Sequence, residues 1–474
     1  MFMAGNRIDL REKIDDWFER HTDEMIDDLG RLIAIRSVRG PESEGAPYGP
    51  GPREALTLAG ELLNNHGLEV SEFEGIIITA DIGPAPPVMG VLAHLDVVSA
   101  GEGWESNPFT MTIEDGKIYG RGAMDNKGPL IASMYAVYCA RDLCPKLRKG
   151  ARIILGSGEE SGCHDIEQYL SKVVPPPNVF TPDAFFPLIN TEKGRFLPFF
   201  KASWNEDKTL PRVVSIVGGK TANIVPDKAE AVIEGIALSD VLTACRGYST
   251  RTGALLTVRE EGERLVISAE GKPAHAALVH LGNNAQTALL TMLASMPFAA
   301  SEGFEHIKAL SRLLPHGDCG GRALGIEMSD IESGELTVNF SVMSYELSGM
   351  TGHLDSRTPI CADNADIAGM TRKKLESEGF ELFAHDITRS HHTPADTPFV
   401  QALLRIYKEY IGDHGRCDAM GGMTYVHGIP GGVAFGCGMP GIDNRIHGAN
   451  EFIDIEHLIL SAKMFTQAIM DMCS

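Results

Sequence analysis

Apolar runs of strand length alternate with helical sequence in the first third of the chain, and this alternation restricts the fold more than any other feature. GIIITADIG (75–83), VMGVLAHLDVV (88–98) and ARIILGSGEE (151–160) have the length and β-branched content of buried strands. PLIASMYAVYCARDL (129–143), between the last two, has apolar residues at helical spacing. The pattern predicts an α/β fold, with a sheet flanked by helices.

The rest of the chain divides by its pattern into three parts. Residues 8–36 and 53–66 are amphipathic and predict surface helices of the first part, residues 1–190. Residues 191–387 contain short alternating runs and one long helical stretch, NAQTALLTMLASM, which predict a separate α+β domain inserted into the first. Residues 388–474 return to helical pattern and complete the first domain.

Charge and cysteine content exclude several classes of protein. Lys plus Arg number 42 against 64 Asp plus Glu, so the net charge of −22 opposes binding to nucleic acid or an anionic membrane. The N-terminal sequence lacks an apolar signal segment, and no stretch approaches the roughly 18 apolar residues of a membrane helix. The nine cysteines include no C-x-x-C pair, which favours a reducing compartment. We therefore expect a cytoplasmic enzyme that holds any metal with His and carboxylates.

Residues that can bind metal lie toward the end of the second predicted strand, 88–98. His94 and Asp96 come directly after VMGVLA, and their i, i+2 spacing places both side chains on one side of an extended backbone. An imidazole is a good ligand for a divalent transition metal, and a nearby carboxylate can fix its tautomer. Alone, the pair is more typical of a polar strand end than of a metal site.

Two adjacent carboxylates at the end of ARIILGSG carry more information. Glu159 and Glu160 would repel each other unless a cation or a shared proton separated their roles. One can bind metal while the other takes a proton from metal-bound water. A solvated acidic turn is the alternative.

Three more residues complete a possible ligand set. Asp125 lies in the turn GRGAMDNKGP, where it could instead cap the following helix. Asp183 in FTPDA and His447 in NRIHGANE lie in loop-like sequence, where most such residues are solvated, and His427 in TYVHG is a weaker rival for His447. Two imidazoles and three carboxylates, one of them bridging, can hold two ions about 3.5–4 Å apart. The ordered set is therefore more specific than any of its members.

The motifs resemble those of the ArgE/DapE/PepV family of dinuclear metallopeptidases and deacylases, most closely its PepV-type dipeptidases. The matching segments are HLDVV, DGKIYGRGAMDNKGP, the Glu-Glu pair, FTPDAFFPLIN, NIVPD, GKPAHA, LDSRTP and GGMTY. The resemblance implies a catalytic domain with an inserted lid and two divalent ions, Zn²⁺ before Mn²⁺ or Co²⁺. In the PepV branch an enlarged lid replaces a dimer partner, so a monomer is expected.

The resemblance also implies the metal ligands by position in this sequence. His94 and Asp183 would hold one ion, Glu160 and His447 the other, and Asp125 would bridge them.

Five further residues receive roles from the same motifs. Asp96 would orient His94. Glu159 would be the general base for a metal-bridging water that attacks the peptide carbonyl. In the lid, His275 would stabilise the oxyanion, while Arg357 and Asn223 would bind the carboxylate of the substrate.

The expected activity is therefore hydrolysis of dipeptides, and two alternatives stay open. A deacylase of N-acyl amino acids or a carboxypeptidase of the same family would use the same residues. A catalytically silent peptide-binding protein would belong to another class, but it would have no need to retain Glu159. The run GCGMPG (436–441) matches a dinucleotide-binding fingerprint, yet its proline and the sequence after it predict no helix for a pyrophosphate.

Overall fold

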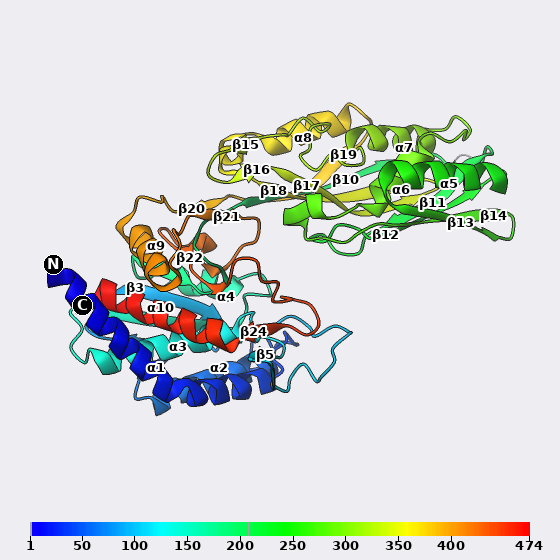
Figure 1. The fold of residues 1–474 in the computed structure, drawn as a ribbon. Helices are drawn as coiled ribbons and strands as arrows, with labels where there is room; N and C mark the ends of the chain where they lie inside the picture. Colours follow the sequence, from blue (N-terminus) through cyan, green and yellow to red (C-terminus); the bar gives the residue numbers. More distant parts are fainter. Residues whose placement is uncertain (1, 207) are drawn as a thin grey trace. The chain divides into compact units, whose positions relative to one another are not determined.

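The computed structural model describes residues 2–206 and 208–474, with side chains from residue 9 onward, and it contains two compact units (Figure 1). The first unit comprises Met1–Thr191, His392–Asp418 and Met423–Ser474. The second comprises Glu192–His391 and the short segment Ala419–Gly422. The sequence pattern, which divided the chain at 190/191 and 387/388, did not single out this short segment.

A mixed sheet of nine strands forms the centre of the first unit. Across the sheet the strands are β1 (Val70–Phe73), β2 (Ile77–Ile82), β6 (Gly150–Gly156), β3 (Pro87–His94), β7 (Asn178–Thr181), β22 (Val433–Ala434), β9 (Ile189–Glu192) and β20 (His391–His392), with β21 (Asp418–Met420) also paired to β9. β3 runs parallel to both β6 and β7, so the carboxyl ends of these three strands lie at the same edge.

Alternate residues of the central strands enter two different apolar clusters. Val91 and Ile153 join the larger cluster, and their chain neighbours Leu92 and Ile154 join a smaller one on the other face. A strand whose two faces are both buried has the nearly continuous apolar sequence seen in β3 and β6. This pattern explains why these strands were recognisable from the sequence, and the predicted α/β fold class is confirmed.

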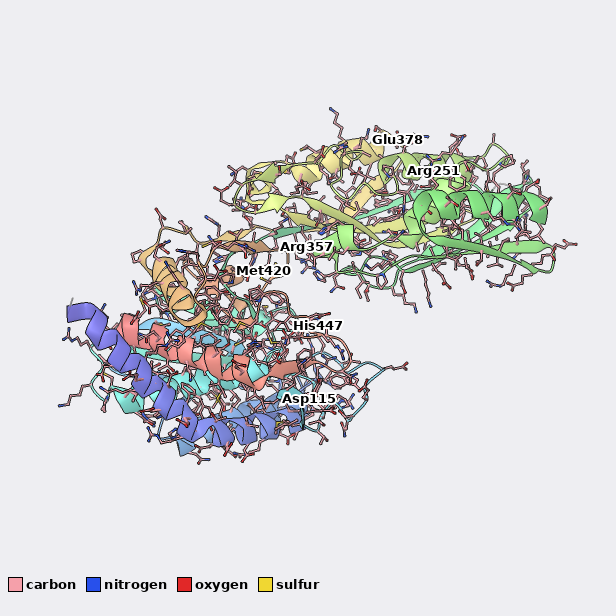
Figure 2. The ribbon with its side chains drawn as sticks, in the orientation of Figure 1. Asp115, Arg251, Arg357, Glu378, Met420 and His447 are labelled. Carbon is pink, nitrogen blue, oxygen red and sulfur yellow. The ribbon has the colours of Figure 1, made fainter. Side chains whose placement is uncertain are left out.

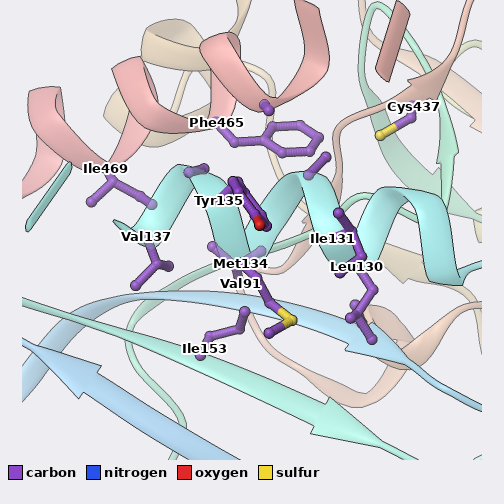
Figure 3. Packing of buried hydrophobic residues seen from close by; sticks show 14 of the residues in the cluster. Val91, Leu130, Ile131, Met134, Tyr135, Val137, Ile153, Cys437, Phe465 and Ile469 are labelled. Carbon is purple, nitrogen blue, oxygen red and sulfur yellow. The ribbon is translucent and has the colours of Figure 1, made fainter. Parts of the chain in front are cut away.

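Helices cover both faces of this sheet. They are α1 (Phe2–Ala34), α2 (Pro50–Asn65), α3 (Lys127–Leu143), α4 (His164–Leu170), α9 (Pro398–Ile411), α10 (Ile455–Cys473) and the 3₁₀ helix η3 (Tyr425–Gly428). Figure 3 shows α3 between the strands and α10, with Met134 toward the strands and Phe465 packed from α10. Every residue of α3 from Lys127 to Ala140 is buried, as expected for a helix that is apolar on all sides.

The second unit is built on an eight-stranded antiparallel sheet. Its order is β13 (Leu255–Glu261), β14 (Arg264–Glu270), β12 (Lys228–Glu234), β11 (Arg212–Gly218), β17 (Thr337–Glu346), β18 (Gly349–Thr358), β10 (Gly194–Ser203) and β19 (Glu381–Thr388). The helices are α5 (Leu238–Thr252), α6 (Ala285–Leu293), α7 (Glu302–Leu313) and α8 (Ile367–Glu376). The predicted helical stretch NAQTALLTMLASM contains α6, but the expectation that it is the one helical stretch here was wrong, because α5, α7 and α8 are helices as well.

Short elements complete the structure. They are β4 (Thr112–Glu114), β5 (Lys117–Tyr119) and β24 (Phe452–Asp454) in one small sheet, the pairs β8 (Ala184–Phe185) with β23 (Cys437–Gly438) and β15 (Ser329–Asp330) with β16 (Gly334–Glu335), and the 3₁₀ helices η1 (Ala276–Leu281) and η2 (Ile360–Asn364). Among the described residues, none of the helices combines the length and apolar character needed to cross a membrane. All nine cysteines are free thiols.

Candidate metal centre

The predicted ligands gather at the edge where the three parallel strands end. His94 is the last residue of β3, and it lies opposite Gly156, the last residue of β6. Glu159 and Glu160 follow β6 by a few residues, and Asp183 follows β7 in the same way. The carboxyl edge of parallel strands is the usual place for a ligand site in such sheets. Residues that are far apart in the sequence therefore lie close together in the structure.

Two loops bring the remaining ligands to this edge. Asp125 lies in the turn immediately before α3, and His447 lies in the loop before β24; Figure 2 labels His447 in the first unit. Two groups of potential metal ligands result, one formed by His94, Glu159 and Asp183 and the other by Asp125, Glu160 and His447, with the ligand atoms of each group within 4.8 Å of one another. The rival His427 belongs to neither group in the described part of the chain.

Asp125 faces both groups with a different oxygen. Its Oδ1 lies 3.1 Å from Nε2 of His94, and its Oδ2 lies 2.9 Å from Nε2 of His447. The same His94 nitrogen is 3.4 Å from Oδ2 of Asp183, and the same His447 nitrogen is 3.2 Å from Oε1 of Glu160. A carboxylate directed at two imidazoles in this way has the arrangement required of a ligand that bridges two ions.

The tautomer of His94 fits a metal ligand. Its Nδ1 lies 3.0 Å from the main-chain carbonyl oxygen of Asp96, to which Nδ1–H donates, so Nε2 is the nitrogen that can bind a metal once it has lost its proton. Nε2 is buried, and among the described residues it has no hydrogen-bond partner. It is nevertheless close to oxygens of Asp125 and Asp183. A divalent cation would satisfy this nitrogen and both carboxylates, so these residues fit the ions that the motifs imply.

Asp96 has a second function that its motif did not suggest. Its Oδ1 accepts the N–H of Glu159 and its Oδ2 accepts the N–H of Glu160, each at 3.1 Å. Oδ1 is also 3.4 Å from Nδ1 of His94. The buried Asp96 side chain therefore fixes the turn that carries both glutamates as well as the imidazole ring.

The concentration of carboxylates shifts the ionisation of the whole group. Burial would lower the pKa of His94, but Asp183 and the other nearby carboxylates raise it well above its usual value. Hydrogen bonds to Asp125 and Glu160 raise the pKa of His447 to about 11. Without a metal, these imidazoles hold protons that neutralise the surrounding carboxylates.

The pKa values of the two glutamates are raised, whereas a carboxylate in an ordinary ion pair has a lowered pKa. Burial raises the pKa of Glu159 well above its usual value, although His94 opposes the shift. Burial and the charge of Asp125 raise the pKa of Glu160 to about 7. A carboxylate with a raised pKa is a stronger base, which suits a group that must accept a proton at neutral pH.

Several residues that support the site had no clear signal in the sequence. Asn126 is fully buried, and its Nδ2 donates to Oδ1 of Asp183 at 2.9 Å. Asp165 accepts the N–H groups of Ser157 and Gly158, each at 2.8 Å, and the hydroxyl of Tyr425. The position of Asn126 between Asp125 and a lysine in the motif could have indicated its role, but Asp165 resembles any polar residue that begins a helix.

The three remaining predicted residues lie in the second unit. The segments of Asn223 and His275 are joined by backbone pairing. Ile224 pairs with His275, and the carbonyl of Asn223 accepts the N–H of Ala276 at 2.8 Å. Nδ1 of His275 accepts the N–H of Ala277 at 3.2 Å, so the proton of the neutral ring is on Nε2. Both side chains belong to exposed residues.

Arg357 lies on β18 of the same unit, where Figure 2 labels it together with Met420 of the segment 419–422. Its guanidinium binds the buried Asp355 through two hydrogen bonds of 2.7 and 3.0 Å and also donates to the carbonyl of Gly421. Gly421 in turn contacts Ala277, two residues after His275, so tightly that a Cβ there would lie 2.4 Å from the Cβ of Ala277. The second unit thus brings the segment that follows His275 and the side chain of Arg357 to the same glycine.

Comparison with known proteins identifies the class. The model of peptidase family M20/M25/M40 matches residues 90–471, and the chain therefore belongs to this family of peptidases. The resemblance to the ArgE/DapE/PepV metallopeptidases that the motifs indicated is confirmed.

Individual relatives narrow the comparison. The protein named "Putative dipeptidase YtjP" of Bacillus subtilis is 33% identical over 96% of this chain and 98% of its own length. "Putative dipeptidase SH1171" of Staphylococcus haemolyticus is 32% identical with the same coverage. Among solved structures, human carnosine dipeptidase 1 superposes with a TM-score of 0.57 at 16% identity, covering 98% of both chains. The di-peptidase Dug1p of Saccharomyces cerevisiae superposes with a TM-score of 0.56 at 13% identity, covering 97% of this chain and 98% of its own. At these identities the structural likeness concerns the fold alone.

Proposed function

We propose that this chain is a dipeptidase that depends on two divalent ions. The observation that carries the proposal is the position of Asp125, whose two oxygens face His94 and His447 separately. The names of the two bacterial relatives support dipeptides as the substrate class. When bound, the ions would polarise the peptide carbonyl and lower the pKa of a coordinated water to about 7.

The chain's own residues supply the remaining chemistry. Glu159 accepts a proton from the attacking water and then gives it to the departing amine. Its raised pKa, which results from burial, makes the carboxylate a competent base. Asp96 keeps Glu159 in place through the hydrogen bond to its backbone N–H.

The residues of the second unit complete the proposal. His275 would donate a hydrogen bond from Nε2 to the oxyanion, and the tautomer defined by the Ala277 N–H suits this role. Asp355 fixes the plane of the Arg357 guanidinium through two hydrogen bonds. Arg357 would bind the substrate carboxylate together with Asn223. We further propose a cytoplasmic monomer with zinc as the native metal; mixed imidazole and carboxylate ligands also suit manganese and cobalt.

A combined metal and substrate assay tests this function. Purified protein should bind two zinc, manganese or cobalt ions per chain and hydrolyse dipeptides with a free amino terminus. N-acetyl amino acids and peptides of four or more residues should be poor substrates. Preference for N-acetyl amino acids would instead assign a deacylase. Two bound metals with no hydrolysis of any member of the panel would favour the silent peptide-binding alternative.

A further inference from the structure

Glu451 is a completely buried carboxylate that receives hydrogen bonds from the turn carrying Asp125. It accepts the backbone N–H groups of Met124 and Asp125 at 2.8 and 2.9 Å, and that of Gly122 at 3.1 Å. A buried carboxylate is stable only when its charge is compensated, and backbone N–H groups supply part of that compensation here. Through these bonds Glu451 fixes the main chain at the bridging aspartate.

Arg121 supplies the opposite charge and extends the connection to other loops. Its side chain is 1% exposed, and Nη1 donates to Oε2 of Glu451 at 2.6 Å. Nη2 donates to the carbonyl of Gly448 at 3.0 Å and to that of Ala100 at 3.2 Å. Gly448 directly follows His447, so the ion pair between Arg121 and Glu451 connects the loop of His447 with the turn that carries Asp125.

The loop of His447 needs such an anchor. The His447 side chain is 54% exposed, so packing does not fix its position. Its backbone, with a φ of 62°, adopts the left-handed conformation that a residue with a Cβ rarely occupies, as do Arg445 and Asn450 with a φ of 58° each. Such a conformation persists only where surrounding contacts determine it, and the bond from Arg121 to Gly448 is one of these contacts.

We infer that Glu451 and Arg121 are positioning residues that hold the backbone at Asp125 and beside His447. They thereby set the affinity of the metal position formed by Asp125, Glu160 and His447. The inference rests on the proposed dinuclear function. Neither residue is a ligand: Glu451 contacts the backbone of Asp125, and Arg121 contacts the backbone beyond His447. The ion that depends on Asp125, Glu160 and His447 is therefore the one most affected by their loss.

Zinc titration of the metal-free protein by calorimetry tests the inference without reference to activity. Glu451→Gln removes the charge that receives the N–H groups, and Arg121→Lys keeps the positive charge but loses the fork that reaches Gly448. Both variants should weaken one of the two zinc-binding steps by about 10- to 100-fold, the usual effect of removing a residue that orients a metal ligand. The other step shares only the bridging Asp125 with this position, so it should weaken less.

Asp81→Asn is the matched control. Asp81 on β2 and Arg152 on β6 of the same unit form a bidentate ion pair with distances of 2.7 and 2.8 Å, and neither residue belongs to a group of potential metal ligands. This control should leave both zinc steps unchanged, even where its melting temperature falls. Wild-type zinc affinity in folded Glu451→Gln or Arg121→Lys would overturn the inference and leave the ion pair a purely structural one.

A second measurement separates positioning from general destabilisation. If zinc occupancy limits the variants, their kcat should return toward the wild-type value at saturating zinc, and the visible spectrum of the cobalt-loaded protein should change at the weakened position. A spectrum identical to the wild type would contradict the inference. Wild-type protein that binds two zinc ions yet hydrolyses no dipeptide would refute the proposed function, while the zinc affinities of the variants would still decide the positioning role.

Discussion

Glu159 and Glu160 are neighbours in the sequence, yet each faces a different half of the centre. Glu159 groups with His94 and Asp183, whereas Glu160 groups with Asp125 and His447. Their backbone N–H groups bind the two oxygens of one carboxylate, that of Asp96, which explains how adjacent acidic side chains can be held in separate environments. Different environments can give two carboxylates different chemical roles.

Substitution of each glutamate should separate base from ligand. Glu159→Gln should keep both metals and lower kcat by about 10²- to 10⁴-fold, because general-base catalysis has this magnitude. Glu160→Gln should instead reduce the bound metal, since its Oε1 is directed at the nitrogen of His447. Metal analysis and dipeptide hydrolysis on the same samples provide the measurement. A fully active Glu159→Gln variant would remove this residue from the mechanism.

Metal binding should release protons and weaken at low pH. The pKa of His447 is raised to about 11 and that of Glu160 to about 7, so at pH 7 the metal-free site holds a protonated His447 and a partly protonated Glu160. Both must lose their protons to bind metal. Zinc affinity should therefore rise as the pH increases from 6 to 8, and the calorimetric heat should depend on the ionisation enthalpy of the buffer. Identical heats in buffers of different enthalpy would contradict the assignment.

The turn after β6 is an element whose geometry depends on one buried hydrogen-bond group. Asp165, at the start of α4, accepts the N–H groups of Ser157 and Gly158 and the hydroxyl of Tyr425 in η3. These bonds tie three elements together directly beside the glutamate pair. The ring of Tyr425 also lies edge-on to that of His94, with the centroids 6.1 Å apart.

Tyr425→Phe should therefore destabilise the first unit. Removing the hydroxyl leaves a buried carboxylate short of one donor, which costs about 1–3 kcal/mol. Tyr138→Phe is the control, because the buried hydroxyl of Tyr138 has no hydrogen-bond partner among the described residues. Urea denaturation should show a lower midpoint for Tyr425→Phe and little change for Tyr138→Phe. Equal effects of the two substitutions would mean that the hydroxyl of Tyr425 contributes nothing specific.

Elements with many apolar residues could be predicted from the sequence, and elements with few buried apolar residues could not. α3 and β3 are buried on all sides, so their composition alone identified them. α5 buries only Val241, Cys245 and Thr252, and three buried residues are too few to produce a recognisable helical pattern. Tertiary packing, not local periodicity, determines such an element.

The same distinction applies to the candidate site. Its proposed ligands follow recognisable strands or lie in motifs, so their order along the chain could be read. Glu451 and Asp165 could not be found in this way, because a single acidic residue in a loop or in the first turn of a helix is normally solvated, and only the fold shows that these two are buried and hydrogen-bonded. Supporting residues are defined by contacts between segments hundreds of residues apart, as with Arg121 and Glu451.

At the scale of the whole molecule, the two units have separate apolar cores. The larger cluster, which contains α3, and the smaller cluster, which contains Leu92 and Ile154, belong to the first unit, and a third cluster around α6 belongs to the second. All five proposed metal ligands lie in the first unit. Metal should therefore stabilise one unit directly and leave the intrinsic stability of the other unchanged.

Calorimetric unfolding with and without metal tests this separation. At free zinc 1,000 times the dissociation constant, one bound ion contributes about 4.1 kcal/mol to the stability of the unit that holds it. For a unit of this size each kcal/mol corresponds to roughly 2–4 °C in Tm, so the chelator EDTA should move one transition downward by several degrees and leave a second in place. Glu160→Gln should reduce the change in Tm that EDTA causes, because this variant lacks one of the proposed metal ligands, all of which lie in the first unit. A single transition that moves as a whole would show instead that the two units unfold cooperatively, and the stability contributed by metal would then extend to the lid residues His275 and Arg357 as well.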